Sequence, residues 1–195
     1  MTATGSASAL HDVIFGRRSV RDFTGKKLDE ATIRELLAAA VRAPTAVHEE
    51  PWRFLIVQDE TALLRLSDRA KALFTEQVKR LHVHREGHAL DAFSRPEFNV
   101  FYGAGTLIVI CGRAADPFVA ADCWLAAENL MLTAHAMGFG SCVIGSAVEA
   151  LNAPDIKADL SIPEDLVAVA PVIVGIPADQ GRPTARKAAE ILAWR

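Results

Sequence analysis

Three uninterrupted apolar segments constrain the fold of this chain most strongly. They cover residues 54–57, 106–111 and 167–175. None of them is long enough to cross a lipid bilayer as a helix. Apolar residues follow one another in these segments instead of alternating with polar ones, which is typical of strands covered on both faces. The sequence therefore predicts a sheet whose strands are buried on both sides.

Helical patterns lie between these strands. The clearest is the amphipathic segment 27–42, where Asp29 is placed to cap the first turn and Pro44 to stop the helix. Further elements are expected as helices at 8–16, 60–81, 116–137 and 148–160, and as a short strand or extended loop at 140–145. Because helices and strands are irregularly spaced, the sequence favours an α+β fold over a regular βαβ alternation.

The segment 116–137 is apolar nearly all round. Asp116-Pro117 is a helix-start signal, with an acid at the N-cap and a proline at the first helical position. Gly138 is a typical residue for ending a helix. A helix of this composition is buried, and its alanines allow a neighbour to approach closely. We expect it to be the central helix, packed against another subunit as well as against its own sheet.

Composition narrows the classes of protein. The length of 195 residues, with 51% hydrophobic and 23% charged residues, suits a single globular domain spanning residues 1–195. A net charge of −3 gives no reason to expect nucleic-acid binding, and residues 1–8 show no signal peptide. The three cysteines form no C-x-x-C pair, which argues against disulfides or zinc and favours a reducing compartment. We expect a cytoplasmic protein with neither nucleic acid nor membrane as a partner.

The segment 17–23 concentrates hydrogen-bond donors on a short arc of backbone. It carries Arg17, Arg18 and Arg21 together with Ser19. Guanidinium groups bind phosphates and carbonyl-rich ring edges through paired hydrogen bonds. The alternative is a solvated basic turn, in which Ser19 is only a helix cap or turn former.

Other patterns indicate no chemistry of their own. His82, His84 and His88 are interpreted as surface histidines, because no carboxylate pair or cysteine completes a metal site, and no metal is expected. Trp52 and Trp124 are expected to be core or interface anchors. No nucleophile triad, carboxylate pair or phosphate-binding loop indicates hydrolysis or phosphoryl transfer, so no catalytic side chain is predicted.

Five stretches of the chain, taken in order, resemble motifs of the FMN-dependent nitroreductases. They are 17–23, 43–54, 102–104, 138–145 and 172–177, the last followed by Pro183, Arg186 and Lys187. Each motif is weak alone, but five in register cover the chain from about residue 11 to its end. The resemblance implies a three-layer α-β-α sandwich with a mixed, mostly antiparallel sheet. It also implies an entwined homodimer in which a C-terminal arm, about residues 181–195, reaches the partner subunit.

The resemblance further implies an activity. Such enzymes bind FMN at the subunit interface, with two sites per dimer built by both chains. NAD(P)H reduces the flavin, and a nitroaromatic, quinone or similar small-molecule acceptor reoxidises it by a ping-pong route. The cofactor carries the redox chemistry, and the protein supplies position, charge and shape.

Carried over residue by residue, the resemblance assigns flavin contacts to separate parts of the chain. The phosphate and the ring would be held by Arg17, Arg18, Ser19, Arg21, Arg186 and Lys187. A cation near N1 and O2 would stabilise the negative charge of a reduced flavin. One ring face would be covered, from the other subunit, by Pro44, Thr45 and Ala46. Over the ring would lie Ile144 and Gly145, which offer a backbone N–H near N5, and Asn99 would face the ring as well.

Two positions depart from the family pattern. His48, counted among the flavin-binding residues, and Glu50 stand where the family usually has Asn and Gln. A carboxylate near the flavin disfavours the anionic reduced form, whereas a protonated His48 favours it. The departures leave open a flavin carrier or sensor without turnover, and a specialised flavin chemistry such as dehydrogenation, dehalogenation or flavin cleavage.

Overall fold

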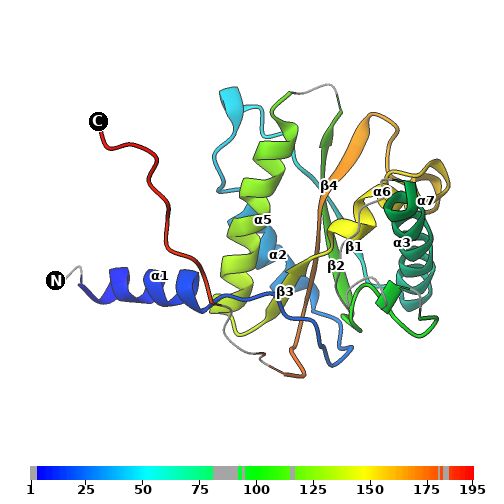
Figure 1. The fold of residues 1–195 in the computed structure, drawn as a ribbon, viewed down its shortest axis with the longest axis horizontal. Helices are drawn as coiled ribbons and strands as arrows, with labels where there is room; N and C mark the ends of the chain where they lie inside the picture. The colour runs from blue at the N-terminus through cyan, green and yellow to red at the C-terminus, as the bar shows by residue number, and fades with distance from the viewer. Residues whose placement is uncertain (1–3, 81–91, 94, 115–116, 180, 182–184) are drawn as a thin grey trace.

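The computed structural model describes residues 4–80, 92–93, 95–114, 117–179, 181 and 185–195, and its centre is a four-stranded sheet (Figure 1). The strands are β1 (Arg53–Val57), β2 (Thr106–Arg113), β3 (Gly140–Val143) and β4 (Leu166–Gly175), in the order β1-β2-β4-β3. The three predicted strands are confirmed, and 140–145 supplies the fourth. Burial on both faces is confirmed for β2 and most of β4, whereas β1, at the edge of the sheet, is buried only at Val57. Every pair of strands is antiparallel. In the described part of the chain, parallel pairing is limited to an isolated bridge between Ser19 and Ser141.

One face of the sheet is covered by α2 (Glu30–Ala40) and α5 (Val119–Ala136) (Figure 1). The predicted cap of α2 is confirmed, because the Asp29 carboxylate accepts a hydrogen bond from the Thr32 N–H at 2.7 Å. The predicted start of α5 is wrong. Pro117 lies in a turn before the helix, so it is not the first helical residue, and Asp116 lies outside the described residues. Gly138 ends α5 with a φ of +84°, a backbone conformation that favours glycine.

The inner side of α5 is buried as predicted, and its outer side is where the predicted contact with another subunit would lie. Its sheet-facing side is fully buried, but Trp124 is 41% exposed and Leu125 46% exposed. Trp52, in contrast, is buried in the core as expected. The outer side of α5 therefore presents large apolar side chains that a single chain leaves uncovered.

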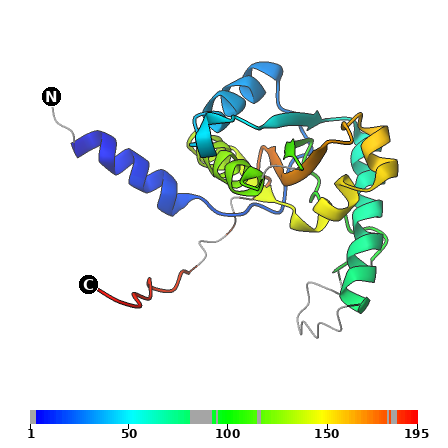
Figure 2. The ribbon, with the colours of Figure 1, turned by 90° about the horizontal axis from the view of Figure 1, so that it is seen from above.

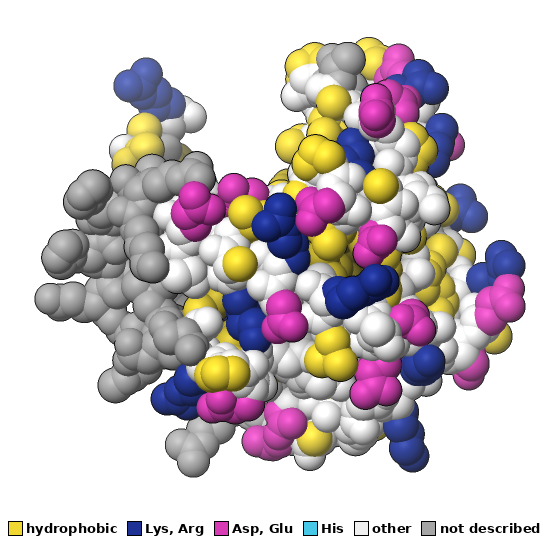
Figure 3. All heavy atoms as spheres, turned by 90° about the vertical axis from the view of Figure 1, so that its right-hand side faces the viewer, with side chains coloured by type: hydrophobic (Ala, Val, Ile, Leu, Met, Phe, Trp, Pro, Cys, Tyr) yellow, Lys and Arg dark blue, Asp and Glu magenta, His cyan; other side chains and the backbone are white. Residues whose placement is uncertain are grey.

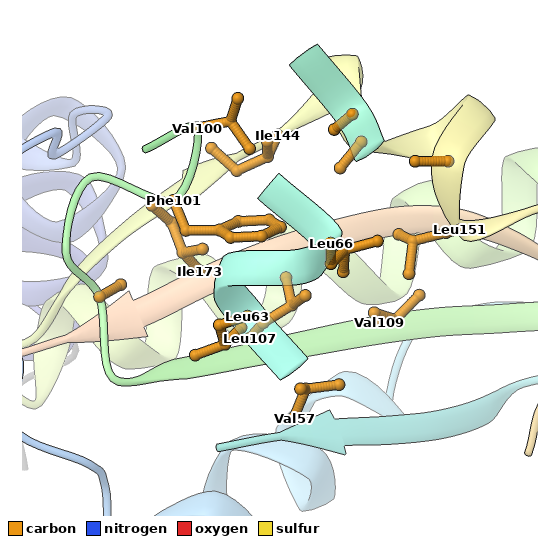
Figure 4. Packing of buried hydrophobic residues seen from close by; sticks show 14 of the residues in the cluster. Val57, Leu63, Leu66, Val100, Phe101, Leu107, Val109, Ile144, Leu151 and Ile173 are labelled. Carbon is orange, nitrogen blue, oxygen red and sulfur yellow. The ribbon is translucent and has the colours of Figure 1, made fainter. Parts of the chain in front are cut away.

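The other face of the sheet carries α3 (Glu60–Arg80), the 3₁₀ turn η2 (Gly145–Ala147), α6 (Val148–Leu151) and α7 (Pro154–Asp159) (Figure 1). Pro154 begins α7 and thereby divides the single helix predicted at 148–160. Figure 4 shows how Leu63 and Leu66 of α3 lie against the sheet and Phe101. On the outside of this layer basic and acidic side chains are interspersed (Figure 3). Arg65 and Arg69 of α3 form ion pairs with Asp159 and Asp155 of α7.

Both ends of the chain project from the α5 side of the molecule (Figures 1 and 2). The N-terminal helix α1 (Thr4–Gly16) exposes Leu10, Ile14 and Phe15. The C-terminal segment 185–195 has no regular secondary structure, and its Leu192 and Trp194 are almost fully exposed. Among the described helices, none combines the length and apolar character that crossing a membrane requires. The histidines His82, His84 and His88 lie outside the described residues.

Candidate functional site

The arginine-rich segment 17–23 is an extended stretch held against the edge strand β3, and not a free turn. The Val20 N–H donates to the Ser141 carbonyl at 3.0 Å, and Ser19 forms a bridge with Ser141. Val20 and Phe23 are buried, which fixes the segment to the body of the protein. The residues between these anchors, including Arg21, are exposed. The sheet edge therefore holds the arginine backbone in place and leaves the side chains accessible.

Two cavities flank Arg17 and Arg18. The larger, about 440 Å³, is lined by both arginines together with Glu128 and Arg186. Arg17 Nε lies 3.3 Å from Glu128 Oε1, and Arg18 Nη1 donates to the Gly181 carbonyl at 3.2 Å. Basic residues from the two ends of the chain thus border one space, and these are the residues to which the prediction assigns the phosphate. Lys187 follows Arg186 in the exposed C-terminal segment but does not line the cavity.

The second cavity, about 190 Å³, shows two groups that the sequence interpretation missed. It is lined by Arg17, Arg18, His135 and Ser141, among others. Burial lowers the pKa of His135, and the neighbouring Arg18 and Arg17 charges lower it further. The buried Ser141 hydroxyl has no hydrogen-bond partner among the described residues. The position of His135 just before the helix-ending Gly138 is a weak signal that could have drawn attention to it.

Ser19 and Arg21 lie close to Cys142 and Tyr102, two residues that were not among the predicted site residues. Burial raises the pKa of both Cys142 and Tyr102, and the Arg21 charge partly offsets the shift in each. A hydrogen bond from Ser19 also lowers the pKa of Cys142. Tyr102 has a φ of +53°, which is uncommon for a residue other than glycine. A half-buried phenol is therefore held in a strained backbone beside an exposed guanidinium.

Asn99 lies apart from the arginines. Its side-chain oxygen accepts a hydrogen bond from the Phe101 N–H at 2.8 Å. It lines a different cavity of about 190 Å³, together with Gly103 and Gly105. The structure does not bring Asn99 into the cavities that Arg17 borders.

The predicted pair Ile144 and Gly145 divides into a core residue and an accessible one. Ile144 is buried, points into the core in Figure 4, and uses its N–H to bond the Pro171 carbonyl at 2.9 Å. Gly145 begins η2, and a Cβ added there would meet nothing within 4 Å. The first N–H groups of a helix have no partner inside the helix. Of the two, Gly145 is the residue whose N–H can face a ligand.

The remaining predicted residues, Pro44, Thr45, Ala46 and His48, belong to a loop beside the first turn of α5. The Ala46 N–H donates to both carboxylate oxygens of the buried Asp122, at 3.2 and 3.3 Å. Val47, His48 and Glu50 have φ values of +47°, +58° and +45°. The loop therefore combines an exposed surface with an unusual backbone.

The loop 44–48 lies beside the first turn of α5, whereas the cavities that Arg17 and Arg18 border lie toward the C-terminal half of this helix (Figure 1). Asp122, which holds the loop, lies in the first turn of the helix, and His135, beside Arg17, lies in the last. A rise of 1.5 Å per residue places these two positions about 20 Å apart along the axis. One chain alone therefore does not bring the loop and the arginines together.

The side chains that line these cavities include donors of the kind that bind anions, beside the carboxylate of Glu128. Guanidinium groups favour phosphate, and a serine hydroxyl adds a neutral donor. Within the described ranges, no group of three or more His, Cys, Asp or Glu is arranged to hold a metal ion.

Comparison with known proteins agrees with this architecture. The sequence profile of the Nitroreductase family matches residues 14–176. The chain is 28% identical, over 86% of its length and 85% of the relative's, to a putative NADH dehydrogenase/NAD(P)H nitroreductase of Archaeoglobus fulgidus. It is 27% identical to an iodotyrosine deiodinase of Thermotoga neapolitana, covering 68% of this chain and 71% of that protein. The structure of a nitroreductase with bound FMN from Bacteroides fragilis matches with a TM-score of 0.76 and 25% identity, covering 95% and 97% of the two chains. On this evidence and on its fold, the chain belongs to the nitroreductase family.

Proposed function

We propose that this protein is an FMN-dependent oxidoreductase that uses NAD(P)H to reduce nitroaromatic, quinone or similar small-molecule acceptors by a ping-pong mechanism. The observation that carries the proposal is the convergence of Arg17, Arg18 and Arg186 on one cavity. Three guanidinium groups around one space suit the phosphate of a mononucleotide. The FMN in the related Bacteroides fragilis structure supports the choice of flavin.

The residues present fit FMN in chemical type. Arg17, Arg18 and Arg186 would hold the phosphate, with Lys187 adding positive charge nearby. Gly145 offers a backbone N–H without a side chain in the way, which suits close approach of a ring. Arg21 would stabilise negative charge on the pyrimidine end of the ring. When bound, FMN would accept hydride from NAD(P)H and pass electrons to the acceptor.

We also propose that the working unit is a homodimer. The loop 44–48 and the arginines lie apart along α5. One chain therefore supplies only part of the contacts predicted for one flavin. A two-fold axis that pairs two α5 helices antiparallel would bring the loop of one chain to the arginines of the other. The exposed Trp124 and Leu125 on α5, and the apolar side chains of α1, provide surface for this contact. The C-terminal segment would reach the partner from the same side.

Two other functions share this cofactor. The deiodinase relative favours reductive dehalogenation of an aromatic acceptor as the second candidate. His48 and Glu50, which depart from the family pattern and are exposed on the loop, support a flavin carrier without turnover as an alternative.

Anaerobic flavin reduction separates these candidates. The purified protein, reconstituted with FMN, should be yellow and should bleach with NADH or NADPH. Reoxidation by a nitroaromatic, a quinone or a halogenated phenol then identifies the acceptor class, and parallel double-reciprocal plots identify the ping-pong route. Bound flavin that neither nicotinamide reduces would indicate a carrier. A colourless protein that FMN cannot reconstitute would overturn the proposal.

A further inference from the structure

We infer that Asp122 is a positioning residue that holds the loop 45–50 in the one shape with which it can cover a flavin bound by the partner subunit. Its effect on the loop follows from contacts within this chain. Its effect on flavin and acceptor rests on the proposed function.

Asp122 is a buried carboxylate with an unusual set of partners. Asp122 is only 3% exposed and lies in the first turn of α5. Removing a carboxylate from water is costly unless hydrogen bonds compensate it. The Ala46 N–H provides such a bond, shared between Oδ1 and Oδ2. The positive end of the α5 dipole lies at this turn and favours a negative charge there.

The same residue also holds the far end of the loop. The Trp52 indole Nε1–H donates to the backbone carbonyl of Asp122 at 3.1 Å. Trp52 and the preceding Pro51 are buried, whereas residues 47–50 are exposed. Asp122 therefore anchors the loop at its start through the side chain and at its end through the main chain.

The loop between these anchors needs external support. Val47, His48 and Glu50 all have left-handed φ values, and none of them is glycine. For a β-branched residue such as Val47 this conformation is a genuine outlier. Such residues cost roughly 1–3 kcal/mol each and persist only when the surrounding structure imposes them. Residues 47–50 are exposed, and the hydrogen bonds that hold the loop within the described part of the chain are that of the Glu49 N–H, which donates to the Ala46 carbonyl at 3.1 Å, and the two contacts to Asp122.

This arrangement changes what the loop offers to a ligand. The Ala46 N–H is already bonded to Asp122, so it is not a donor toward a flavin. The loop instead presents the exposed side chains from Val47 to Glu50, which include the two departures from the family pattern, His48 and Glu50. Asp122 would set the position of both without touching the flavin.

Hydrogen–deuterium exchange of the purified protein, measured with and without added FMN, tests the effect of Asp122 on the loop. Asp122→Asn keeps the shape but removes the charge, and Asp122→Ala removes both acceptors. Asp155→Asn on α7, in the opposite layer, is the matched control. We expect exchange of the amides of residues 45–50 to be at least tenfold faster in Asp122→Ala, with a smaller increase in Asp122→Asn and none in the control. Unchanged exchange in a folded Asp122 variant would overturn the inference.

Trp52→Phe keeps the test decisive if the Asp122 variants do not fold. This change removes the Nε1–H donor but keeps a six-membered aromatic ring in the core, although the smaller side chain also leaves a cavity there. It should speed exchange across residues 47–50 several-fold, and unchanged exchange there would again overturn the inference.

Steady-state kinetics test the second part of the inference, which is the effect of Asp122 on flavin and acceptor. In Asp122→Asn the acceptor KM should rise more than kcat falls, and Asp122→Ala should show the larger change. Faster loop exchange with unchanged acceptor kinetics and FMN affinity would mean that Asp122 is structural only. If the parent protein binds no FMN, the proposed function fails, while the exchange result still decides the role of Asp122 in the loop.

Discussion

Arg17 is the residue around which most of the site contacts gather. It borders both cavities, pairs with Glu128 at 3.3 Å and lowers the pKa of His135. Its guanidinium is largely buried, since its side chain is 18% exposed. A buried charge gains more electrostatic free energy from an anionic partner than a solvated charge does. Two predictions follow from this environment.

Arg17→Ala should weaken FMN binding by about 1.5–3 kcal/mol, or roughly 10- to 150-fold in Kd, because it removes a charge-assisted hydrogen bond. Fluorescence titration of the apoprotein with FMN measures the change. Arg34→Ala, which breaks an exposed ion pair on α2, is the control and should leave Kd unchanged. An unaltered Kd for Arg17→Ala would remove Arg17 from the phosphate site.

His135 should make stability depend on pH. Burial and two arginines hold its pKa below the ordinary value of 6.5, so the unfolded chain takes up the proton first as pH falls. Stability should therefore decrease as pH falls through 6.5 toward the lowered pKa of His135 in the folded protein. In His135→Gln this decrease should be smaller, as measured by urea midpoints. The same change at the exposed His11 is the control. Identical pH profiles for parent and His135→Gln would contradict the prediction.

At the scale of elements, close backbone contacts decide where the site segments lie. The segment 24–27 crosses the start of β2, and a Cβ added to Gly105 would lie 2.5 Å from the Gly25 carbonyl oxygen and 2.8 Å from the Lys26 backbone. Backbone atoms cannot rotate away as a side chain can. Glycine at this position therefore allows the chain that follows the arginines to dock on the sheet.

Gly105→Ala should destabilise the protein by about 1–3 kcal/mol, the usual cost of forcing atoms into a packed site. Gly145→Ala is the matched control, because its added Cβ meets open space and should change stability by less than about 0.5 kcal/mol. Urea denaturation measures both. If Gly145→Ala keeps its stability but weakens FMN binding, Gly145 faces the ring; equal stabilities of the two variants would refute the packing argument.

At the scale of the whole molecule, the single chain leaves large apolar side chains exposed on one side. Its apolar surface is concentrated on the α5 side, where α1 and the C-terminal segment also project (Figures 1 and 2). The predicted flavin contacts are separated along α5. Both features are explained at once if a second copy covers that side.

Leu125→Arg should therefore produce a monomer that no longer retains FMN, because a charge would be buried in the subunit contact. Light scattering after size exclusion, together with flavin absorbance, measures both effects. Leu64→Arg on α3 makes the same change at a position of similar exposure in the opposite layer, and it should leave the oligomeric state unchanged. A Leu125→Arg dimer that retains FMN would place the interface elsewhere.

Much of the fold could be predicted from local sequence. The apolar runs mark the strands because a buried strand needs continuous apolar residues. Asp29 and Gly138 mark helix ends because their preferred backbone or capping geometry is local. Pro154 begins α7, although the sequence pattern predicted one helix at 148–160 with this proline inside it. The start of α5 was predicted wrongly because such signals are only local: an Asp-Pro pair favours a helix start, but the observed helix begins two residues beyond the proline.

The sequence by itself thus determined the strands, most helices and the residue types of an anion site. Only the tertiary structure decided that Arg186 lies beside Arg17, that Ser19 pairs with Ser141, and that Asp122 holds Ala46. It also decided that the loop and the arginines lie apart along α5. Local periodicity depends on neighbours a few residues away, whereas these contacts join residues more than 70 positions apart and exist only once the layers have packed.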